Sequence, residues 1–241
     1  MQWSDLRRML NRVTAVLLSA AGAAALMGCA GFPPDMGAQL TGASLQSYAE
    51  AAEALRELGI GGLSDDCIGE LEETEKQNAS ISGSDRALML LYMVGCGTYD
   101  PETWAWTPGE NGVYCFDMEV FAVDTMYTDF LRGISAIGCG ELEFTDIRED
   151  TGAVDWETGT GERTVSFCWN GETYTLRAKS MDDWFDPQAA KQLSSIIRKS
   201  GSEKRLYFTN SGQICYAFYG DPDWAKAFSK TTGIPLHDGL F

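Results

Sequence analysis

The spacing of apolar and polar positions changes near residue 113, from a helical repeat to strand-like alternation. Upstream, apolar residues recur every three to four positions in stretches that begin near residues 45, 65 and 85, which predicts three helices. Downstream, the stretch "VYCFDMEV" places Tyr114 and Phe116 on one face and Cys115 and Asp117 on the other. That period of two predicts a strand with one buried face.

The strongest local signal is a hairpin in the stretch "RTVSFCWNGETYTLRA". Asn170-Gly171 favours a two-residue turn of type I′, because both residues tolerate a positive φ. This turn sets the register and puts three cross-strand pairs on the buried face: Trp169/Glu172, Phe167/Tyr174 and Val165/Leu176. A second hairpin fits "KRLYFTNSGQICYAFYG", with its turn at Asn210-Ser211-Gly212.

Each hairpin precedes a helix that begins with Asp-Pro, at Asp186-Pro187 and at Asp221-Pro222. The aspartate can cap the first turn, and proline at the first helical position needs no amide partner. A further helix is expected over 125–137, from the spacing of its apolar residues. The fold class is therefore α+β, with N-terminal helices followed by an antiparallel sheet built from hairpins, and with helices packed on one face.

The same pattern divides the chain into segments. Residues 44–96 form a helical segment, and 97–112 form a connection rich in proline and glycine that also contains tryptophan. Residues 113–241 form an α+β domain.

The first 28 residues have a different character. Arg7, Arg8 and Arg12 precede an uncharged, mostly apolar run, Val13–Met27, whose fifteen residues would make about 22 Å of helix. A bilayer core of about 30 Å needs a longer helix. A basic start, a short apolar run and small residues before a break are typical of a secretory signal peptide.

Leu26-Met27-Gly28-Cys29 resembles the lipobox of bacterial lipoproteins. The resemblance implies that residues 1–28 are removed, that Cys29 carries a diacylglyceryl group, and that the protein is anchored by lipid at the extracytoplasmic face of the cell membrane. Residues 29–43, rich in glycine, proline and alanine, then form a flexible tether. A buried helix ending in Gly-Cys and an uncleaved anchor are the alternatives.

The charge of the chain is strongly acidic. The formal net charge is −17, and without residues 1–28 it is 15 − 34 = −19. Nucleic acid would be repelled, whereas a basic protein partner would be attracted. A generic solvated acidic surface explains the same composition.

Six cysteines follow Cys29, and none of them lies in a C-x-x-C pair (Cys67, Cys96, Cys115, Cys139, Cys168 and Cys215). In an oxidising compartment they could form three disulfides, whereas buried free cysteines behave as small apolar side chains. Both states remain open, and Cys168 is expected on the more polar face of its hairpin.

Catalytic motifs are missing from the sequence. The single histidine, His237, has no nucleophile motif around it, and no cofactor loop or metal-ligand spacing is present, so no cofactor, metal or catalytic residue is assigned. Asp182-Asp183 and Asp155/Glu157 are the acid pairs that a secreted hydrolase could use.

Trp104 and Trp106 lie two positions apart in the connection. Exposed indoles there could stack on a carbohydrate or pack on a partner protein, or instead hold the loop against the sheet. The sequence thus favours a non-enzymatic binding or interaction module anchored outside the cell. The alternatives are an acidic inhibitor or immunity-type protein that neutralises a basic enzyme or toxin, and a carboxylate-dependent hydrolase.

Overall fold

The computed structural model describes residues 45–77, 83–120 and 122–240. Of these, residues 99–105 group apart, and 45–98 together with 106–240 form one compact unit. The two are described separately below, the larger unit first.

Besides one short strand at residues 106–107, the larger unit contains six α-helices and seven strands among the described residues, joined mostly by short turns. The helices are α2 (Tyr48–Glu57), α3 (Asp65–Gln77), α4 (Gly83–Gly95), α5 (Met126–Ile137), α6 (Pro187–Lys199) and α7 (Pro222–Thr232). The strands are β3 (Tyr114–Asp117), β4 (Thr145–Asp155), β5 (Thr160–Trp169), β6 (Glu172–Met181), β7 (Arg205–Ser211), β8 (Ile214–Gly220) and β9 (His237–Asp238). A short 3-10 helix, Val123–Thr125, leads into α5.

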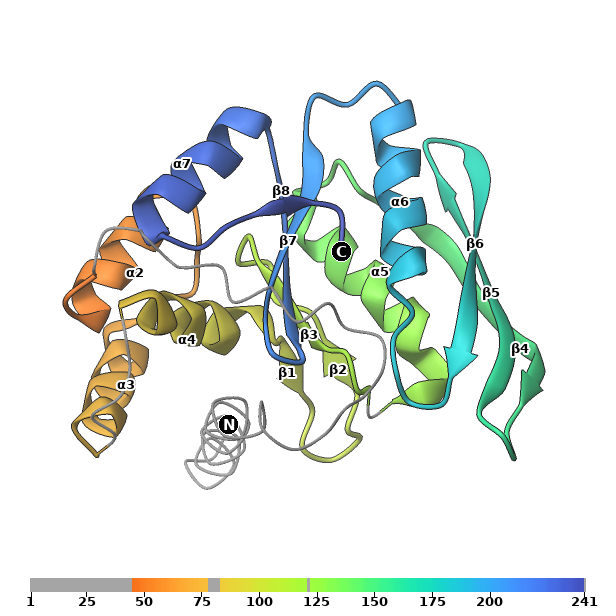
Figure 1. Ribbon diagram of the computed structural model, residues 1–241, viewed down its shortest axis with the longest axis horizontal. Coiled ribbons are helices and arrows are strands. Elements are labelled where there is room, and N and C mark those ends of the chain that lie inside the picture. Colours follow the sequence, from red (N-terminus) through yellow and green to blue (C-terminus); the bar gives the residue numbers. More distant parts are fainter. Residues whose placement is uncertain (1–44, 78–82, 121, 241) are drawn as a thin grey trace. The chain divides into compact units, whose positions relative to one another are not determined.

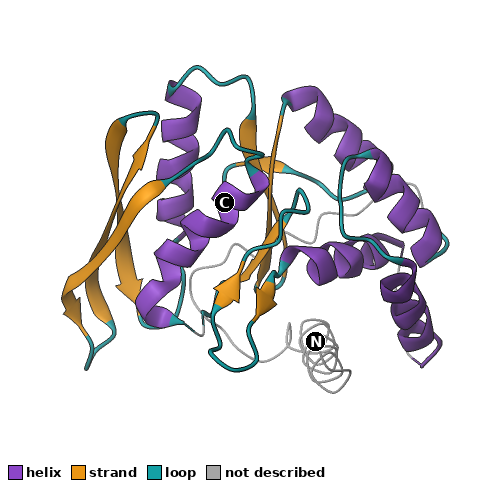
Figure 2. Ribbon diagram, turned by 180° about the vertical axis from the view of Figure 1, so that it is seen from behind, coloured by secondary structure: helices purple, strands orange, loops and turns teal. Residues whose placement is uncertain are grey.

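The strands form two antiparallel sheets, one in the order β4-β5-β6 and the other in the order β3-β8-β7-β9. Helix α5 contacts β4 of the first sheet and β3 and β8 of the second, while α6 contacts β6 and β7. These two helices therefore lie between the sheets (Figure 1). Figure 2 shows the same order of layers from behind.

The other face of the four-stranded sheet is also covered. Helix α4 contacts β3 and β8, and the ring of Phe228 in α7 packs on Phe218 in β8 at a centroid distance of 4.8 Å. The α+β class is confirmed, but the two predicted hairpins belong to two sheets, and helices cover both faces of one of them.

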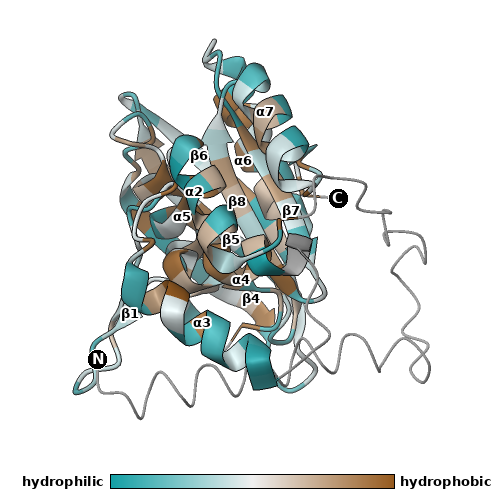
Figure 3. Cartoon of the chain, turned by 90° about the vertical axis from the view of Figure 1, so that its left-hand side faces the viewer, coloured by the Kyte–Doolittle hydropathy of each residue, from teal (hydrophilic) through white to brown (hydrophobic). Residues whose placement is uncertain are grey.

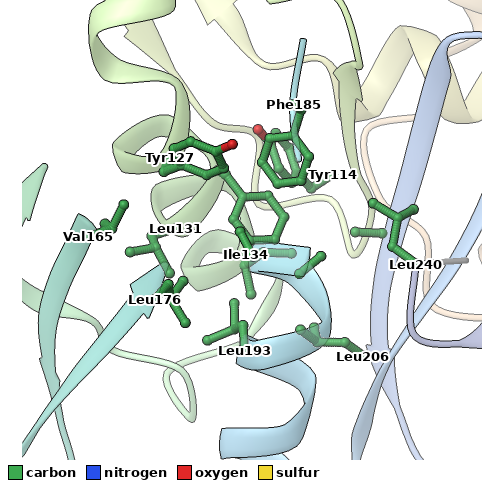
Figure 4. Packing of buried hydrophobic residues seen from close by; sticks show 14 of the residues in the cluster. Tyr114, Tyr127, Leu131, Ile134, Val165, Leu176, Phe185, Leu193, Leu206 and Leu240 are labelled. Carbon is green, nitrogen blue, oxygen red and sulfur yellow. The ribbon is translucent and has the colours of Figure 1, made fainter. Parts of the chain in front are cut away.

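The main core lies where the two sheets meet α5 and α6. Leu131 and Ile134 of α5 and Leu193 of α6 are fully buried between Val165 on one sheet and Leu206 on the other (Figure 4). At about 25 cal/mol per Å² of apolar surface removed from water, this double-sided burial is the main stabilising contribution to the fold.

The register of the first hairpin is confirmed to the residue. Strands β5 and β6 pair with Trp169 opposite Glu172, Phe167 opposite Tyr174 and Val165 opposite Leu176, with Asn170 at φ 52° and Gly171 at φ 78° in the turn. Val165, Phe167, Trp169 and Leu176 are buried, as predicted, but Tyr174 is only half-buried and Glu172, at the start of β6 beside the turn, is exposed. The side chain of Cys168 lies on the wetter face, near Thr173.

Two details of the second sheet correct the sequence prediction. Ser211 pairs with Ile214, so the turn between β7 and β8 is Gly212-Gln213 and not Asn210-Ser211-Gly212. Strand β3 is buried on both faces near its start, because Cys115, predicted on the open face, is covered by α4 and is only 4% exposed.

Both Asp-Pro helix starts are confirmed. The side chain of Asp186 accepts a hydrogen bond from the amide of Gln188 at the start of α6, and Asp221 accepts from Asp223 and Trp224 at the start of α7. The outward helix α3 is largely hydrophilic in Figure 3, in keeping with its run of glutamates.

The predicted signal peptide, Cys29 and the tether to residue 43 lie outside the described residues. Within the part of the chain that the structure describes, no helix combines the length and the apolar character needed to cross a membrane.

Candidate functional site

The segment 99–105 forms a tight turn that carries Trp104. The amide of Asp100 donates to the carbonyl of Ala105 at 2.9 Å, and the amide of Trp104 donates back to the carbonyl of Asp100, also at 2.9 Å. The short strands β1 (Thr98–Tyr99) and β2 (Trp106–Thr107) flank the turn and form a two-stranded sheet. The main chain is thus closed on itself around Trp104.

The side chain of Asp100 reinforces this turn. Its Oδ1 accepts hydrogen bonds from the amides of Glu102 at 3.0 Å and Thr103 at 2.7 Å, and from the Thr103 hydroxyl at 2.8 Å. The bonds from Thr103, followed by the bond from the Glu102 amide, lower the pKa of Asp100 below its usual value. The carboxylate therefore stays ionised and keeps the turn ordered at neutral pH.

Trp104 itself is turned outward. Its side chain is 75% exposed and its backbone has φ 59°, in the left-handed region. That conformation costs a residue with a side chain about 1 kcal/mol or more. A strained backbone that exposes a large aromatic ring is more typical of a contact surface than of a packing position.

Trp106 is used for packing instead. Its indole Nε1 donates to the carbonyl of Cys96 at 2.8 Å, its ring lies 5.8 Å from that of Tyr114, and the Arg132 guanidinium sits 5.6 Å from its ring centroid. The two tryptophans therefore differ: Trp106 holds its strand in place, and Trp104 is presented to solvent.

The candidate acid pairs are engaged in turns. Asp155 accepts from the amides of Glu157 at 2.9 Å and Thr158 at 3.4 Å, and hydrogen bonds from Thr158 and the Glu157 amide lower its pKa. A general acid for glycoside cleavage needs a raised pKa, so this environment favours a structural role. Asp182 has φ 61° and donates its amide to Gly159 at 2.9 Å, which also places it in a turn.

The single histidine lies on a short edge strand, and the two buried cysteines have raised pKa values. His237 is exposed and pairs with Phe208 between β9 and β7. All six cysteines among the described residues are free thiols. Burial raises the pKa of Cys215 to about 12 and raises that of Cys115 as well, which makes both poor nucleophiles.

A buried polar network joins the starts of α5 and α6. Oε2 of Glu149, on β4, accepts from the amides of Tyr127 and Thr128 at 3.1 Å each, while Oε1 pairs with Nη1 of Arg163 at 3.2 Å. The Tyr127 hydroxyl accepts from the amide of Asp186, the cap of α6, at 3.0 Å. Glu149 and Asp186 thus satisfy the free amides at the first turns of both inter-sheet helices.

The charges of this network are almost completely removed from water. The side chains of Arg163 and Glu149 are 1% and 5% exposed. Burial raises the pKa of Glu149, and this effect outweighs the opposing bonds from Thr128 and Arg163. Arg163 also donates to the carbonyl of Val123 at 2.5 Å and lies under the ring of Trp156, at 5.2 Å. The network anchors helices and presents no open reactive group, so we assign it a structural role.

The sequence contains a signal for this network. Arg163 continues the inward series of Val165, Phe167 and Trp169 along β5, and a cation at such a position requires a buried partner. Glu149 could not be found in this way, because two irregularities in the pairing of β4 with β5 shift its register.

Within residues 45–77, 83–120 and 122–240, no group of three or more His, Cys, Asp or Glu side chains is arranged to hold a metal ion. No family model, no curated protein and no solved structure matches the chain.

Proposed function

We propose that this chain is an extracytoplasmic lipoprotein that acts as a non-enzymatic binding module, with Trp104 as its principal contact. The observation that carries the binding role is the 75% exposed indole held in a hydrogen-bonded turn. The lipobox-like residues 26–29 support the anchored location.

The turn favours binding because it is ordered before any ligand arrives. Ordering a side chain or a loop costs about 0.5–1.5 kcal/mol per residue, and a turn already closed by Asp100 avoids much of this cost. An indole offers a flat apolar face for stacking on a sugar or on a partner protein, and tryptophan is enriched among the residues that dominate binding energies. Trp104 therefore combines a strong contact group with a preorganised backbone.

The binding role is tested with residues 30–241, which retain every described residue, on a glycan array and against a panel of basic secreted proteins. Replacing Trp104 with alanine should weaken binding of the ligand found by about 2 kcal/mol, roughly 30-fold. Trp156 provides the matched control, because it is also exposed (53%) but covers Arg163. A ligand that the W104A variant binds as tightly as the parent, or the absence of any ligand in both screens, contradicts the binding role.

The anchored location is tested separately, by mass spectrometry of the protein expressed in a bacterium with a lipoprotein pathway. We expect a mature N-terminus at Cys29 with two or three acyl chains, since one chain alone gives only marginal membrane binding. Cys29→Ala should leave the protein unacylated and released from the membrane fraction. An unmodified Cys29 with residues 1–28 still attached contradicts the lipoprotein assignment and leaves the binding test unaffected.

A further inference from the structure

A small hollow lies on the surface of the larger unit, between α6 and the end of β9. It has a volume of about 240 Å³ and is lined by Lys191, Ser194, Ser195, Arg198, Asp238 and Gly239. The four lining residues of α6 have the spacing i, i+3, i+4 and i+7, which places them on one face of the helix. The hollow shares no residue with the Trp104 turn.

One lining group is a buried hydroxyl without a partner. Ser194 is 6% exposed, and among the described residues its Oγ has no hydrogen-bond partner. Leaving a buried polar group unsatisfied costs about 1–3 kcal/mol, and a hydroxyl can donate one hydrogen bond as well as accept. This oxygen is itself withdrawn from the surface, so the hydroxyl that a ligand in the hollow can reach is that of the exposed Ser195.

The charged groups around the hollow are mainly basic. Asp238 accepts from Arg198 at 2.9 Å through Oδ1 and from Arg205 at 3.2 Å through Oδ2. Both carboxylate oxygens are thus engaged, and each guanidinium retains further N–H groups. The lining carries Lys191 and Arg198 against Asp238, a charge of 2 − 1 = +1, and Arg205 adds a positive charge beside Asp238, in a chain whose net charge is −17.

We propose that this hollow binds a phosphate group, either as inorganic phosphate or as the phosphate of a larger ester. Lysine, arginine and serine are the side chains that donate to phosphate oxygens. A volume of about 240 Å³ lies below the roughly 300–1,000 Å³ of pockets that enclose whole small molecules, so the hollow fits one group. Phosphate also has more acceptor oxygens and more negative charge than a carboxylate, so donors from several side chains favour it.

The dipole of α6 opposes this binding only weakly. The hollow reaches the last turn of the helix at Arg198, where the carbonyl groups carry a partial charge of about −0.5. That effect is about 0.3–1 kcal/mol at the surface and is confined to the last turn. Lys191 and Arg198 line the hollow and carry full positive charges, which outweigh this partial charge.

The test is an NMR titration of amide signals in residues 30–241 at constant ionic strength, with inorganic phosphate, glycerol 3-phosphate and acetate. Phosphate and its ester should cause saturable shifts in α6 and at residues 238–239, and acetate should bind at least 5-fold more weakly. Tighter binding of the ester than of inorganic phosphate would identify a phosphorylated molecule as the ligand, and the reverse would identify the free ion. Shifts that do not saturate, or equal binding of acetate, overturn the proposal.

Matched variants separate a specific site from general attraction of anions. Lys191→Gln should weaken phosphate binding at least 5-fold, whereas Lys199→Gln, the same charge change on α6 outside the hollow, should change it less than twofold. Ser195→Ala should also weaken binding, whereas Ser194→Ala should leave binding unchanged and the stability of the free protein unchanged or higher, because it removes an unsatisfied buried hydroxyl. Equal losses in K191Q and K199Q overturn the proposal.

Discussion

The buried ion pair of Glu149 and Arg163 predicts that one substitution, Arg163→Met, destabilises the parent protein but stabilises a variant that lacks Glu149. Replacing Glu149 with leucine removes the acceptor for two amides at the start of α5 and leaves the Arg163 guanidinium buried without its carboxylate. Loss of a helix cap costs about 1–2 kcal/mol, and isolating a buried charge costs about 3–5 kcal/mol. The two costs arise from one side chain and are therefore not fully additive, so we expect E149L to lower the free energy of unfolding by about 4 kcal/mol, less than their sum at the upper ends of these ranges.

Replacing Arg163 with methionine should have opposite effects in two backgrounds. In the parent protein it isolates the Glu149 carboxylate, which keeps its two amide donors, and we expect a loss of about 3 kcal/mol. In E149L the same change removes a buried charge that has lost its partner. The double variant should therefore be more stable than E149L by about 1.5 kcal/mol, with the loss of the α5 cap remaining.

The measurement is urea unfolding of residues 30–241 followed by tryptophan fluorescence, with equal m-values as the condition for comparing variants. The exposed pair Arg177–Glu162, 67% and 49% exposed on β6 and β5, is the control cycle, and its coupling should stay below about 1 kcal/mol. If R163M destabilises the protein equally with and without Glu149, the two charges are not coupled and the reasoning is refuted.

Two further predictions concern packing and buried thiols. Gly133→Ala in α5 should destabilise the protein by about 1–3 kcal/mol, because an added Cβ would lie 2.4 Å from the Tyr114 ring. Gly69→Ala in α3 is the control: its added Cβ meets no atom within 4 Å, and it should stabilise the protein by about 0.5–1 kcal/mol. Urea unfolding measures both changes and distinguishes their signs. The Cys215 thiol keeps its proton in the folded state up to about pH 12, whereas the unfolded chain loses it from about pH 9. Between these pH values, deprotonation of Cys215 in the unfolded chain should lower the free energy of unfolding by about 1.4 kcal/mol for each unit that the pH rises. Cys215→Ala should reduce that slope in unfolding measurements at pH 9–11, and the same change at the exposed Cys139 should not; equal slopes in both variants would contradict the buried thiol assignment.

Local features of the fold could be predicted from the sequence, because their causes lie within a few residues. Asn170-Gly171 specifies both the turn and the register of β5 with β6, and Asp186 and Asp221 mark the starts of α6 and α7. The assignment of hairpins to sheets could not be predicted in this way. Alternation identifies the faces of β3 but not the helix that covers each, and Cys115 is buried because α4, from an earlier part of the chain, packs on it.

The Trp104 turn and the hollow beside α6 also differ in how far the sequence could predict them. Trp104 could be selected from the sequence because a tryptophan in a proline- and glycine-rich connection is unusual by itself, although only the structure separates it from Trp106. The hollow depends on Asp238, which lies 40 positions from Arg198 and reaches it because β9, at the edge of its sheet, pairs with β7. Periodicity assigns a residue to the buried or the exposed face of one helix or strand. It carries no information on which exposed residues of different elements come together in the fold. Sites formed by such convergence therefore need the tertiary structure, and a single residue in an ordered turn does not.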